Sequence, residues 1–373
     1  MKVLVVNSSL RVGGAESMSI ALANALALEG LDVYFASATG PLRDNLDARV
    51  RFLVTDNANQ AASRVTHELL LYIKHHQFDV VHSHGGMCGL SASIAVKASK
   101  LQAVRVLTHH SRVFRRAPRW ISGPVMRRCA DHFIAISHDK QMDLRALGIS
   151  PERISLIPNF VDVDAIATRV ESLDRAATLR DVGVPEGARV LLMAGRVISA
   201  KRFDNFIRIA AEVARQMPDR EVHALIIGDG PGLEEARRVA AREAAPASVH
   251  FLGYQRDIFP FLAASDVVVF PSEHPEVLPM FLIEASAAAR PVVCSDIPGN
   301  REIITDGETG RVVSDGIAGF AAAAVALLRH PEQGALFAHA AQQRAQARFD
   351  RPAVARETIG VYQRLLAAKA PTR

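Results

Sequence analysis

Cysteines, long apolar runs and a leader segment are scarce or missing in this 373-residue chain, and each scarcity excludes a class of protein. Only three cysteines occur, Cys88, Cys129 and Cys294, in neither a disulfide framework nor a zinc-ligand spacing. No run of about eighteen uncharged apolar residues occurs, so we expect no membrane-spanning helix. Met1 and Lys2 precede only four apolar residues, far short of the apolar region of a signal peptide. We therefore expect a cytoplasmic protein.

Acidic residues are missing from one long segment of the first half. From Arg105 to Arg128 the chain has seven arginines and no Asp or Glu. Residues 1–165 hold 19 Lys and Arg against 14 Asp and Glu, whereas residues 166–373 hold 25 of each. The net charge of +5 therefore comes entirely from the first half, which favours an anionic partner for that half.

The chemistry of that anionic partner has three interpretations. Arginines beside Trp120 suit peripheral contact with an anionic membrane, at its inner face, or with a phosphate-bearing lipid-linked acceptor. A solvated helix explains the same residues equally well. Nucleic acid is the weakest interpretation, because only 6% of the residues are aromatic and few of them lie in the basic segment. We expect no nucleic-acid partner.

The length and the apolar pattern predict an α/β protein of two domains. A chain of 373 residues is too long for one ordinary core. Short apolar runs alternate with helical patterns, which is typical of βαβ units around a parallel sheet. Strands are expected at Lys2 to Val6, Leu31 to Ala36, Val80 to Ser83, Val104 to Thr108, His132 to Ile136, Ile154 to Ile157, Val190 to Ala194, His223 to Ile227, Val249 to Leu252, Val267 to Phe270 and Pro291 to Ser295.

A charged segment with few apolar residues separates the two halves. It follows Ile157-Pro158-Asn159-Phe160 and ends at Pro185, and we expect the hinge there. We place Rossmann-like domains at residues 1–165 and 180–349, with a C-terminal helix at 350–373 that packs back on the first. Asp162-Val163-Asp164 has the spacing of a metal-binding motif, but its position favours a helix entry. Two such domains favour ligand binding in the cleft between them, where the carboxyl ends of the strands meet.

The segment from Glu276 to Glu284 places two carboxylates at the junction of a strand and a helix. Pro279 suits the first helical position, so the free backbone N–H groups of the following turn would face an anion beyond the strand end. A carboxylate beside a phosphate site does not help to bind the phosphate. We therefore expect the two carboxylates to accept hydrogen bonds from hydroxyl groups. Ordinary surface acids on a solvated helix are the alternative.

A second constellation, Gly195-Arg196-Val197-Ile198-Ser199-Ala200-Lys201, directly follows an apolar strand. Two cations at the carboxyl end of a strand suit a diphosphate, because Arg offers a planar fork to phosphate oxygens and Lys a compact charge. Solvated loop cations are the alternative. Gly13-Gly14-Ala15-Glu16 and Gly228-Asp229-Gly230-Pro231-Gly232 also follow strands and resemble ligand-binding loops, although a helix cap and a turn explain them too.

Histidines gather at the ends of two consecutive strands, as His82-Ser83-His84 and as His109-His110. Either pair could be metal ligands. No third ligand of suitable type is placed by the sequence, so we expect no metal and no cofactor. A hydrogen-bonding role near a diphosphate is the preferred interpretation, because a ring nitrogen can donate to an anion.

Taken together, these motifs resemble glycosyltransferase family 4 (GT4), a family of retaining enzymes, and the resemblance covers nearly the whole chain. The matching pieces occur in the family's order: Gly13 to Glu16, Asp79 to His84, Ile157 to Asp162, Gly195-Arg196 with Lys201, Gly228 to Pro231 and Glu276 to Glu284. The resemblance implies the GT-B fold, in which two Rossmann-like domains face each other across a cleft. It also implies metal-independent transfer of a sugar from a UDP- or GDP-sugar to a lipid-linked, polysaccharide or lipopolysaccharide-type acceptor.

The resemblance also implies a role for each site residue. Arg196 and Lys201 would bind the donor diphosphate, Glu284 the ribose and Glu276 the transferred sugar. His110, in the pattern Thr-x-His after Thr108, would contact the donor sugar. The remaining donor-side residues are Gly14, Gly230 and Leu278, and the acceptor-side residues are Glu16, His84 and Arg112.

One residue departs from the family pattern, since Val277 stands where the family usually has glycine. A valine at this position would narrow the sugar pocket and change the choice of donor sugar. The departing diphosphate would itself take the acceptor proton, which explains why no general base stands out. A sugar-nucleotide epimerase of similar architecture and a catalytically silent sugar-nucleotide binding module are the alternatives.

Overall fold

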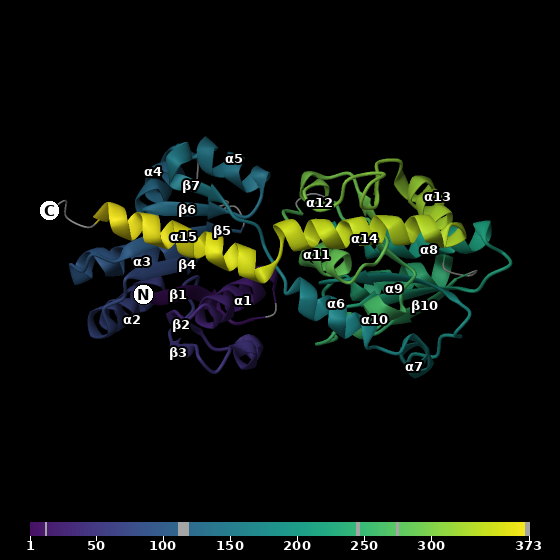
Figure 1. Cartoon of the computed structure of the whole chain (residues 1–373), viewed down its shortest axis with the longest axis horizontal. Helices are drawn as coiled ribbons and strands as arrows, with labels where there is room; N and C mark the ends of the chain where they lie inside the picture. Colours follow the sequence, from purple (N-terminus) through teal and green to yellow (C-terminus); the bar gives the residue numbers. More distant parts are fainter. Residues whose placement is uncertain (12, 111–118, 244–246, 274–275, 370–373) are drawn as a thin grey trace. The chain divides into compact units, whose positions relative to one another are not determined.

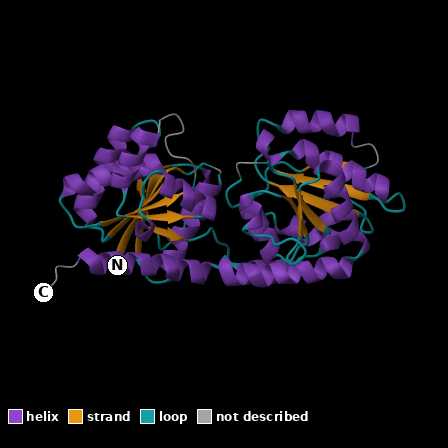
Figure 2. Ribbon diagram, turned by 90° about the horizontal axis from the view of Figure 1, so that it is seen from above, coloured by secondary structure: helices purple, strands orange, loops and turns teal. Residues whose placement is uncertain are grey.

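The computed structural model describes residues 1–11, 13–110, 119–243, 247–273 and 276–369, without the side chains of residues 119–121. The chain forms two compact units (Figure 1). The first consists of Met1–Phe160 together with Arg351–Arg373, and the second of Val161–Asp350. Each unit contains one parallel sheet with helices on both of its faces (Figure 2). The α/β class with two parallel sheets predicted from the sequence is confirmed.

The first unit has a seven-stranded sheet of order β3-β2-β1-β4-β5-β6-β7, in which all neighbours are parallel. Its strands are β1 (Lys2–Ser9), β2 (Asp32–Ala38), β3 (Arg51–Val54), β4 (Val80–His84), β5 (Val104–His109), β6 (His132–Ala135) and β7 (Ile154–Leu156). Its helices are α1 (Gly14–Leu28), η1 (Pro41–Asn45), α2 (Ala62–His76), α3 (Gly86–Ser99), α4 (Arg119–Cys129), α5 (His138–Ala146), η2 (Pro151–Arg153) and α15 (Arg351–Lys369).

The second unit has a six-stranded parallel sheet of order β10-β9-β8-β11-β12-β13. Its strands are β8 (Arg189–Ala194), β9 (Val222–Ile227), β10 (Ser248–Phe251), β11 (Val267–Phe270), β12 (Val292–Ser295) and β13 (Arg311–Val313). Its helices are α6 (Val163–Glu171), α7 (Arg175–Asp181), η3 (Ser199–Lys201), α8 (Phe203–Gln216), α9 (Leu233–Glu243), α10 (Phe259–Ala264), α11 (Met280–Ala287), α12 (Pro298–Arg301), α13 (Gly316–Arg329) and α14 (Pro331–Arg348).

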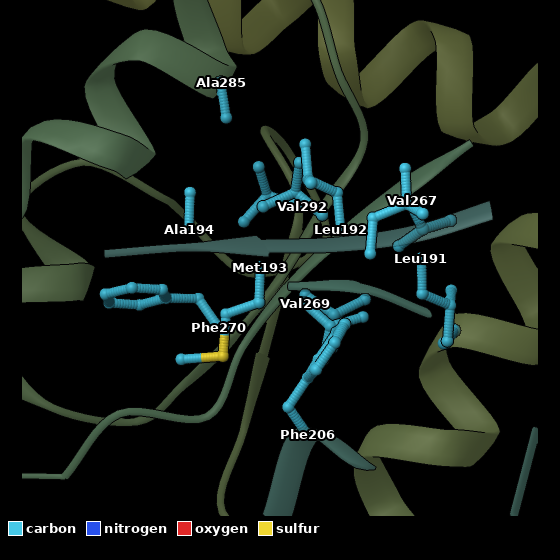
Figure 3. Close-up of a cluster of buried hydrophobic side chains, with 14 of the residues drawn as sticks. Leu191, Leu192, Met193, Ala194, Phe206, Val267, Val269, Phe270, Ala285 and Val292 are labelled. Carbon is cyan, nitrogen blue, oxygen red and sulfur yellow. The ribbon is translucent and has the colours of Figure 1, made fainter. Parts of the chain in front are cut away.

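The core of the second unit explains why its strands are apolar along their whole length. Helices cover both faces of the sheet, so successive residues of a strand are buried on opposite sides. Met193 of β8 lies on the face covered by Phe206 of α8, whereas Ala194 lies on the face covered by Ala285 of α11 (Figure 3). The neighbour of Ala285 on α11 is Glu284, so this packing fixes the height of that carboxylate above the sheet.

The segment that the sequence suggests as a hinge is largely helical. α6 and α7 lie within it, and buried Val163, Ile166 and Val170 of α6 join the core of the second unit. The predicted helix entry is confirmed, because the side chain of Asp162 caps α6 and accepts a hydrogen bond from the backbone N–H of Ala165 at 3.2 Å. The structure therefore assigns this segment to the second unit, from Val161 onward.

α15 follows the second unit in the sequence but belongs to the first unit. The helix packs against α1 and β5, and its Tyr362 side chain is fully buried. At its end, the ammonium of Lys369 donates to the backbone carbonyl of Ala103 at 3.1 Å and to Asp131 at 2.9 Å. The last helix therefore completes the core of the first unit.

Other features that the sequence suggests can be checked in the described residues. All three cysteines are free and buried. None of the described helices is long and apolar enough to cross a membrane. Within the basic segment, Arg105 is an internal residue of β5 whose guanidinium pairs with Asp131 and donates to Ser93 at 2.7 Å. The charge of Arg105 is therefore neutralised within the unit, so this residue offers no free cation to an anionic partner.

Candidate active site

The candidate donor residues of the second unit gather at the carboxyl ends of the strands of its sheet. The chain leaves β8 for β9 on one side and later returns to β11 on the other, so β8 and β11 form the topological switch point. Ligands of open α/β sheets bind at the carboxyl ends of the strands at such a point. Arg196 and Lys201 follow β8, Gly230 follows β9, and Glu276 follows β11. The topology therefore brings these residues to the carboxyl ends of the strands, where ligands of such sheets bind.

Lys201 and Glu276 form an ion pair beyond the carboxyl ends of β8 and β11. The ammonium nitrogen lies 2.5 Å from a carboxylate oxygen, and the two side chains are only 17% and 14% exposed. The same ammonium lies 4.7 Å from the ring centroid of Phe270, the last residue of β11. Partial burial strengthens the attraction between the two charges, so each holds the other in place. The two residues that the sequence assigns to diphosphate and to sugar are thus in direct contact.

Arg196 is exposed, and its guanidinium has no partner among the described residues. Its loop is nevertheless fixed by the backbone. The N–H of Gly195 donates to the carbonyl of Ile227 at 3.0 Å, the N–H of Val197 to Asp229 at 2.9 Å, and the N–H of Gly232 to Val197 at 2.9 Å. These bonds join the loop after β8 to the loop after β9. The result is a rigid platform that presents a free guanidinium.

Glycines make this close approach of two loops possible. Gly228 and Gly230 have φ values of +132° and +155°, which disfavour residues with a Cβ atom. A Cβ atom at 228 would overlap the carbonyl oxygen of Gly195, and one at 230 would overlap that of Val197. Packing between the loops therefore accounts for glycine at 230, whether or not this residue contacts a donor.

The segment before α11 differs from the sequence expectation at Pro279, and it buries the side chain of Leu278. Pro279, expected at the first helical position, is the N-cap, and the helix begins at Met280. Its extended backbone, with ψ of 121°, places it outside the helical region. Leu278, expected among the donor residues, has a side chain that is 5% exposed and packs in the core of the second unit. That side chain therefore has a structural role.

Glu284 lies in the second turn of α11 and is partly buried. Its carboxylate has no hydrogen-bond or ion-pair partner among the described residues. Burial raises the pKa of Glu284 from the ordinary value of 4.5 to about 7. An unpaired carboxylate in this setting costs stability, which indicates that it is kept for binding polar groups of a ligand.

Replacing Glu284 by glutamine is expected to stabilise the protein at pH 8 and to have no such effect at pH 4. The folded protein holds the proton of Glu284 up to about pH 7, whereas the unfolded chain loses it near 4.5. The contribution of this group to stability is therefore complete below pH 4.5 and is lost as the pH rises through 7, by about 3 kcal/mol. Urea unfolding of both proteins at the two pH values measures the difference; equal stability at pH 8 would contradict the burial argument.

Three histidines of the first unit form a column at the carboxyl ends of β4 and β5. The rings of His82 and His84 stack with centroids 4.8 Å apart, and those of His84 and His110 with centroids 5.1 Å apart. Nδ1 of His84 and Nε2 of His110 share a hydrogen bond of 2.9 Å. In the sheet, β4 lies beside β1, and these two strands form the switch point of this unit.

Burial keeps the whole column neutral. It lowers the pKa of His82 to about 3 and that of His110 to about 4, and it lowers the pKa of His84 well below the ordinary 6.5. One of the two facing nitrogens of His84 and His110 must therefore donate and the other accept. These nitrogens are engaged with each other, which does not suit metal ligation, and the described residues contain no group of three candidate metal ligands.

Tyr362, one of two residues that hold this column, could not be found from the sequence. His82 Nδ1 lies 2.5 Å from the hydroxyl of Tyr362 on α15, and its Nε2 lies 2.7 Å from the hydroxyl of Thr108. Tyr362 is 280 residues away in the chain. Only the helical pattern around it was visible, and that pattern indicates a buried face without naming a partner.

The glycine motif after β1 opens α1, as expected. Gly13 is the N-cap, and a Cβ atom at Gly14 would meet nothing within 4 Å. Glu16, at the third helical position, lies over Gly13, so a capping role accounts for it as well as an acceptor role does. Burial raises the pKa of Glu16 and also that of the Cys88 thiol on α3, to which the charge of Glu16 adds. Arg112 lies outside the described residues.

Two family models match the two halves of the chain. The model described as Glycosyltransferase Family 4 matches residues 12–165, and the one described as Glycosyl transferases group 1 matches residues 188–330. The chain belongs to glycosyltransferase family 4. The resemblance stated from the sequence motifs is thereby confirmed. This GT4 chain is a glycosyltransferase with the GT-B fold that uses a nucleotide sugar.

Similar proteins include glycosyltransferases from several bacteria. The chain is 26% identical over 309 residues to the UDP-Gal:alpha-D-GlcNAc-diphosphoundecaprenol alpha-1,3-galactosyltransferase of Escherichia coli. The matched region covers 79% of each protein. It is 35% identical over 246 residues to D-inositol 3-phosphate glycosyltransferase 2 of Catenulispora acidiphila, covering 63% of this chain and 56% of that protein. The crystal structure of Anabaena HepE in complex with UDP-glucose matches with a TM-score of 0.81 at 21% identity, covering 98% of this chain and all of that one.

Proposed function

We propose that this glycosyltransferase moves a hexose from a UDP- or GDP-sugar to a lipid-linked, polysaccharide or lipopolysaccharide-type acceptor, with retention of the anomeric configuration. Arg196 and Lys201 bind the diphosphate, Glu276 binds the sugar and Glu284 accepts hydrogen bonds from the ribose. The observation that carries the proposal is the contact of Lys201 with Glu276 at the switch point of the second unit.

In the donor site, the diphosphate replaces Glu276 as the partner of Lys201. A diphosphate that approaches Lys201 competes with Glu276 for the ammonium, which leaves the carboxylate to accept hydrogen bonds from sugar hydroxyls. Arg196 adds a free planar guanidinium on a rigid loop. Both cations stabilise the negative charge that grows on the diphosphate as its bond to the sugar breaks.

The transfer step needs no separate general base in the second unit. The acceptor hydroxyl attacks the anomeric carbon on the face that the diphosphate leaves. The bond from that carbon to the diphosphate oxygen breaks, and the departing diphosphate takes the acceptor proton. His110, neutral because of its burial, donates or accepts a hydrogen bond with the donor sugar from the ring nitrogen that does not face His84.

The remaining first-unit residues form the acceptor side. Glu16 and His84 lie near the switch point of β1 and β4, and Arg112 follows β5 in the sequence. Gly14 leaves open space above the first turn of α1, which lets its loop approach the donor. The arginines that follow Arg105, up to Arg128, make peripheral contact with anionic lipid and place the enzyme at the inner face of the membrane.

The experiment that tests this proposal is a transfer assay with a panel of donors and acceptors. UDP- and GDP-hexoses are combined with a GlcNAc-diphospho-polyprenol, a lipopolysaccharide core acceptor and D-inositol 3-phosphate, without added metal. Transfer from a nucleotide hexose to a carbohydrate acceptor is expected, and the anomeric proton coupling in the product shows whether the configuration of the donor is kept. An inverted product, or isomerised donor without transfer, would contradict the proposal.

A further inference from the structure

A polar cavity lies in the second unit, at the end of the sheet where its strands begin. Its volume is about 460 Å³. It is lined by residues that immediately precede or begin strands, namely Arg189 at the start of β8, Asp266 before β11 and Pro291 before β12. Lys201, Arg196 and Glu276 follow the carboxyl ends of strands in this sheet. The cavity is therefore separate from the candidate donor site.

Positive charge exceeds negative charge in this cavity. Four arginines line it, Arg175, Arg189, Arg220 and Arg290, together with only two acids, Glu186 and Asp266. The surplus is two positive charges when all six side chains are ionised. The other lining residues are uncharged.

The better buried acid, Asp266, is already engaged by its own unit. One of its carboxylate oxygens accepts from the backbone N–H of Val190 at 2.7 Å and from the guanidinium of Arg175 at 3.0 Å. The nearest approach of Arg189 to the other oxygen is 4.0 Å. Asp266 is thus occupied mainly by Arg175, and Arg189 has only a distant ionic partner.

Two arginines of the cavity keep donors for a further acceptor. Arg290 donates to the backbone carbonyls of Ala288 at 3.0 Å and Ala263 at 3.5 Å, and no carboxylate pairs with it in the described part of the unit. The Nε atom of Arg189 is buried and has no hydrogen-bond partner there. A buried donor without an acceptor is costly, and a bound anion would remove that cost.

The end of α11 holds Arg290 at the wall of the cavity. The backbone N–H of Arg290 donates to the carbonyl of Ala285 at 3.0 Å, and Ala289 adopts a left-handed conformation with φ of +49°. This helix ending normally has glycine at that position, because a Cβ atom disfavours it. Burial and the neighbouring charge of Arg175 lower the pKa of Arg290, as expected where positive charges gather.

We propose that this cavity binds a small ligand bearing a phosphate monoester. Guanidinium groups match phosphate oxygens with paired hydrogen bonds, and a phosphate monoester carries a charge of about −1.5 to −2 near pH 7, which balances the surplus of the lining. The volume exceeds that of a phosphate group alone, so the ligand carries further polar atoms, either as a free phosphorylated metabolite or as the headgroup of phosphatidic acid, whose phosphate is also a monoester. This assignment is independent of the proposed transfer reaction.

The test measures the affinity of the full chain for inorganic phosphate by isothermal titration calorimetry. Arg196 and Lys201 are first replaced by alanine, so that phosphate does not bind the donor-side cations. This background protein is expected to bind phosphate. Adding Arg189→Gln and Arg290→Gln is expected to weaken binding about tenfold or more, because both lost donors are charged. Arg215→Gln is the matched control, since it removes one exposed, paired cation of α8 outside the cavity and is expected to leave the affinity unchanged.

A second variant keeps the test decisive if the double arginine variant does not fold. Glu186 is exposed at the cavity wall, and Glu186→Gln is expected to tighten phosphate binding about twofold or more, because it removes a repelling charge. Glycerol 3-phosphate and phosphatidic acid vesicles then distinguish the two sources: binding of both that depends on Arg189 and Arg290 indicates a headgroup, and binding of the soluble compound alone indicates a metabolite. Absence of phosphate binding, or equal binding by all these variants, would overturn the assignment.

Discussion

Replacing Lys201 by alanine is expected to lower the rate of sugar transfer by about 10²- to 10³-fold, the loss typical of removing one group that stabilises developing negative charge. The ammonium lies at the switch point of the second sheet, 17% exposed and in contact with Glu276. Partial burial makes its charge count for more than that of a solvated lysine. Steady-state kinetics with the preferred nucleotide sugar measures the effect, and it should fall mainly on kcat.

A matched control separates this effect from a general loss of positive charge. Arg215 lies exposed on α8 in the same unit and pairs with Glu212 at 2.7 Å. Arg215→Ala is expected to transfer sugar at the wild-type rate. If the Lys201→Ala protein also transfers sugar at the wild-type rate, Lys201 is not part of the donor site. Its contact with Glu276 is then a purely structural ion pair.

The stability of the same variants shows whether the ion pair also supports the fold. Lys201→Ala leaves the Glu276 carboxylate, 14% exposed, without its cation. Such an uncompensated charge destabilises the folded state, and converting Glu276 to glutamine in the same protein should recover most of the loss. Recovered stability with no recovery of transfer would assign both residues to the reaction as well as to the pair.

Replacing Gly228 by alanine is expected to lower the free energy of unfolding by about 3 to 5 kcal/mol, within the range of the largest single-residue effects. Its φ of +132° is poorly accessible to alanine, and the new methyl group would overlap the carbonyl oxygen of Gly195. Backbone, not a flexible side chain, must therefore move. That movement separates the two loops whose hydrogen bonds fix the position of Arg196.

Gly187→Ala is the matched control for the glycine prediction. A Cβ atom at 187 meets nothing within 4 Å, and its φ lies outside the left-handed range. We expect its stability to change by no more than about 0.5 kcal/mol. Urea unfolding followed by circular dichroism compares the three proteins, and a Gly228→Ala protein as stable as Gly187→Ala would show that the two loops are not rigidly joined.

The sequence predicts the central strands well because they are buried on both faces. Every expected strand occurs in the structure within a few residues of its expected bounds. The strands that were missed, β3 and β13, lie at the edges of their sheets and are only four and three residues long. An edge strand such as Arg51–Val54 is partly exposed, so its apolar pattern is short and resembles a loop.

The candidate site could be predicted as a set of motifs but not as a set of contacts. Arg196, Lys201 and Glu276 could be identified because each follows an apolar strand. The carboxyl ends of parallel strands lie on the same side of the sheet, so the topology alone brings these residues together. The direct pairing of Lys201 with Glu276 depends on side-chain packing across two loops, which no local pattern encodes. Likewise, Arg105 begins a segment without acidic residues, and its pairing with Asp131 depends on the contact between neighbouring strands of the fold.

The central claim is that Arg196 and Lys201 hold the diphosphate of the donor. Isothermal titration calorimetry with a nucleoside diphosphate and with the matching nucleoside, which lacks both phosphates, directly measures how much the diphosphate contributes to the affinity. The wild-type enzyme should bind the diphosphate at least about a hundredfold more tightly than the nucleoside, because charged groups recognise its oxygens, and the Arg196→Ala, Lys201→Ala protein should bind the two compounds with nearly equal affinity. A double variant that keeps the full preference for the diphosphate would contradict the account.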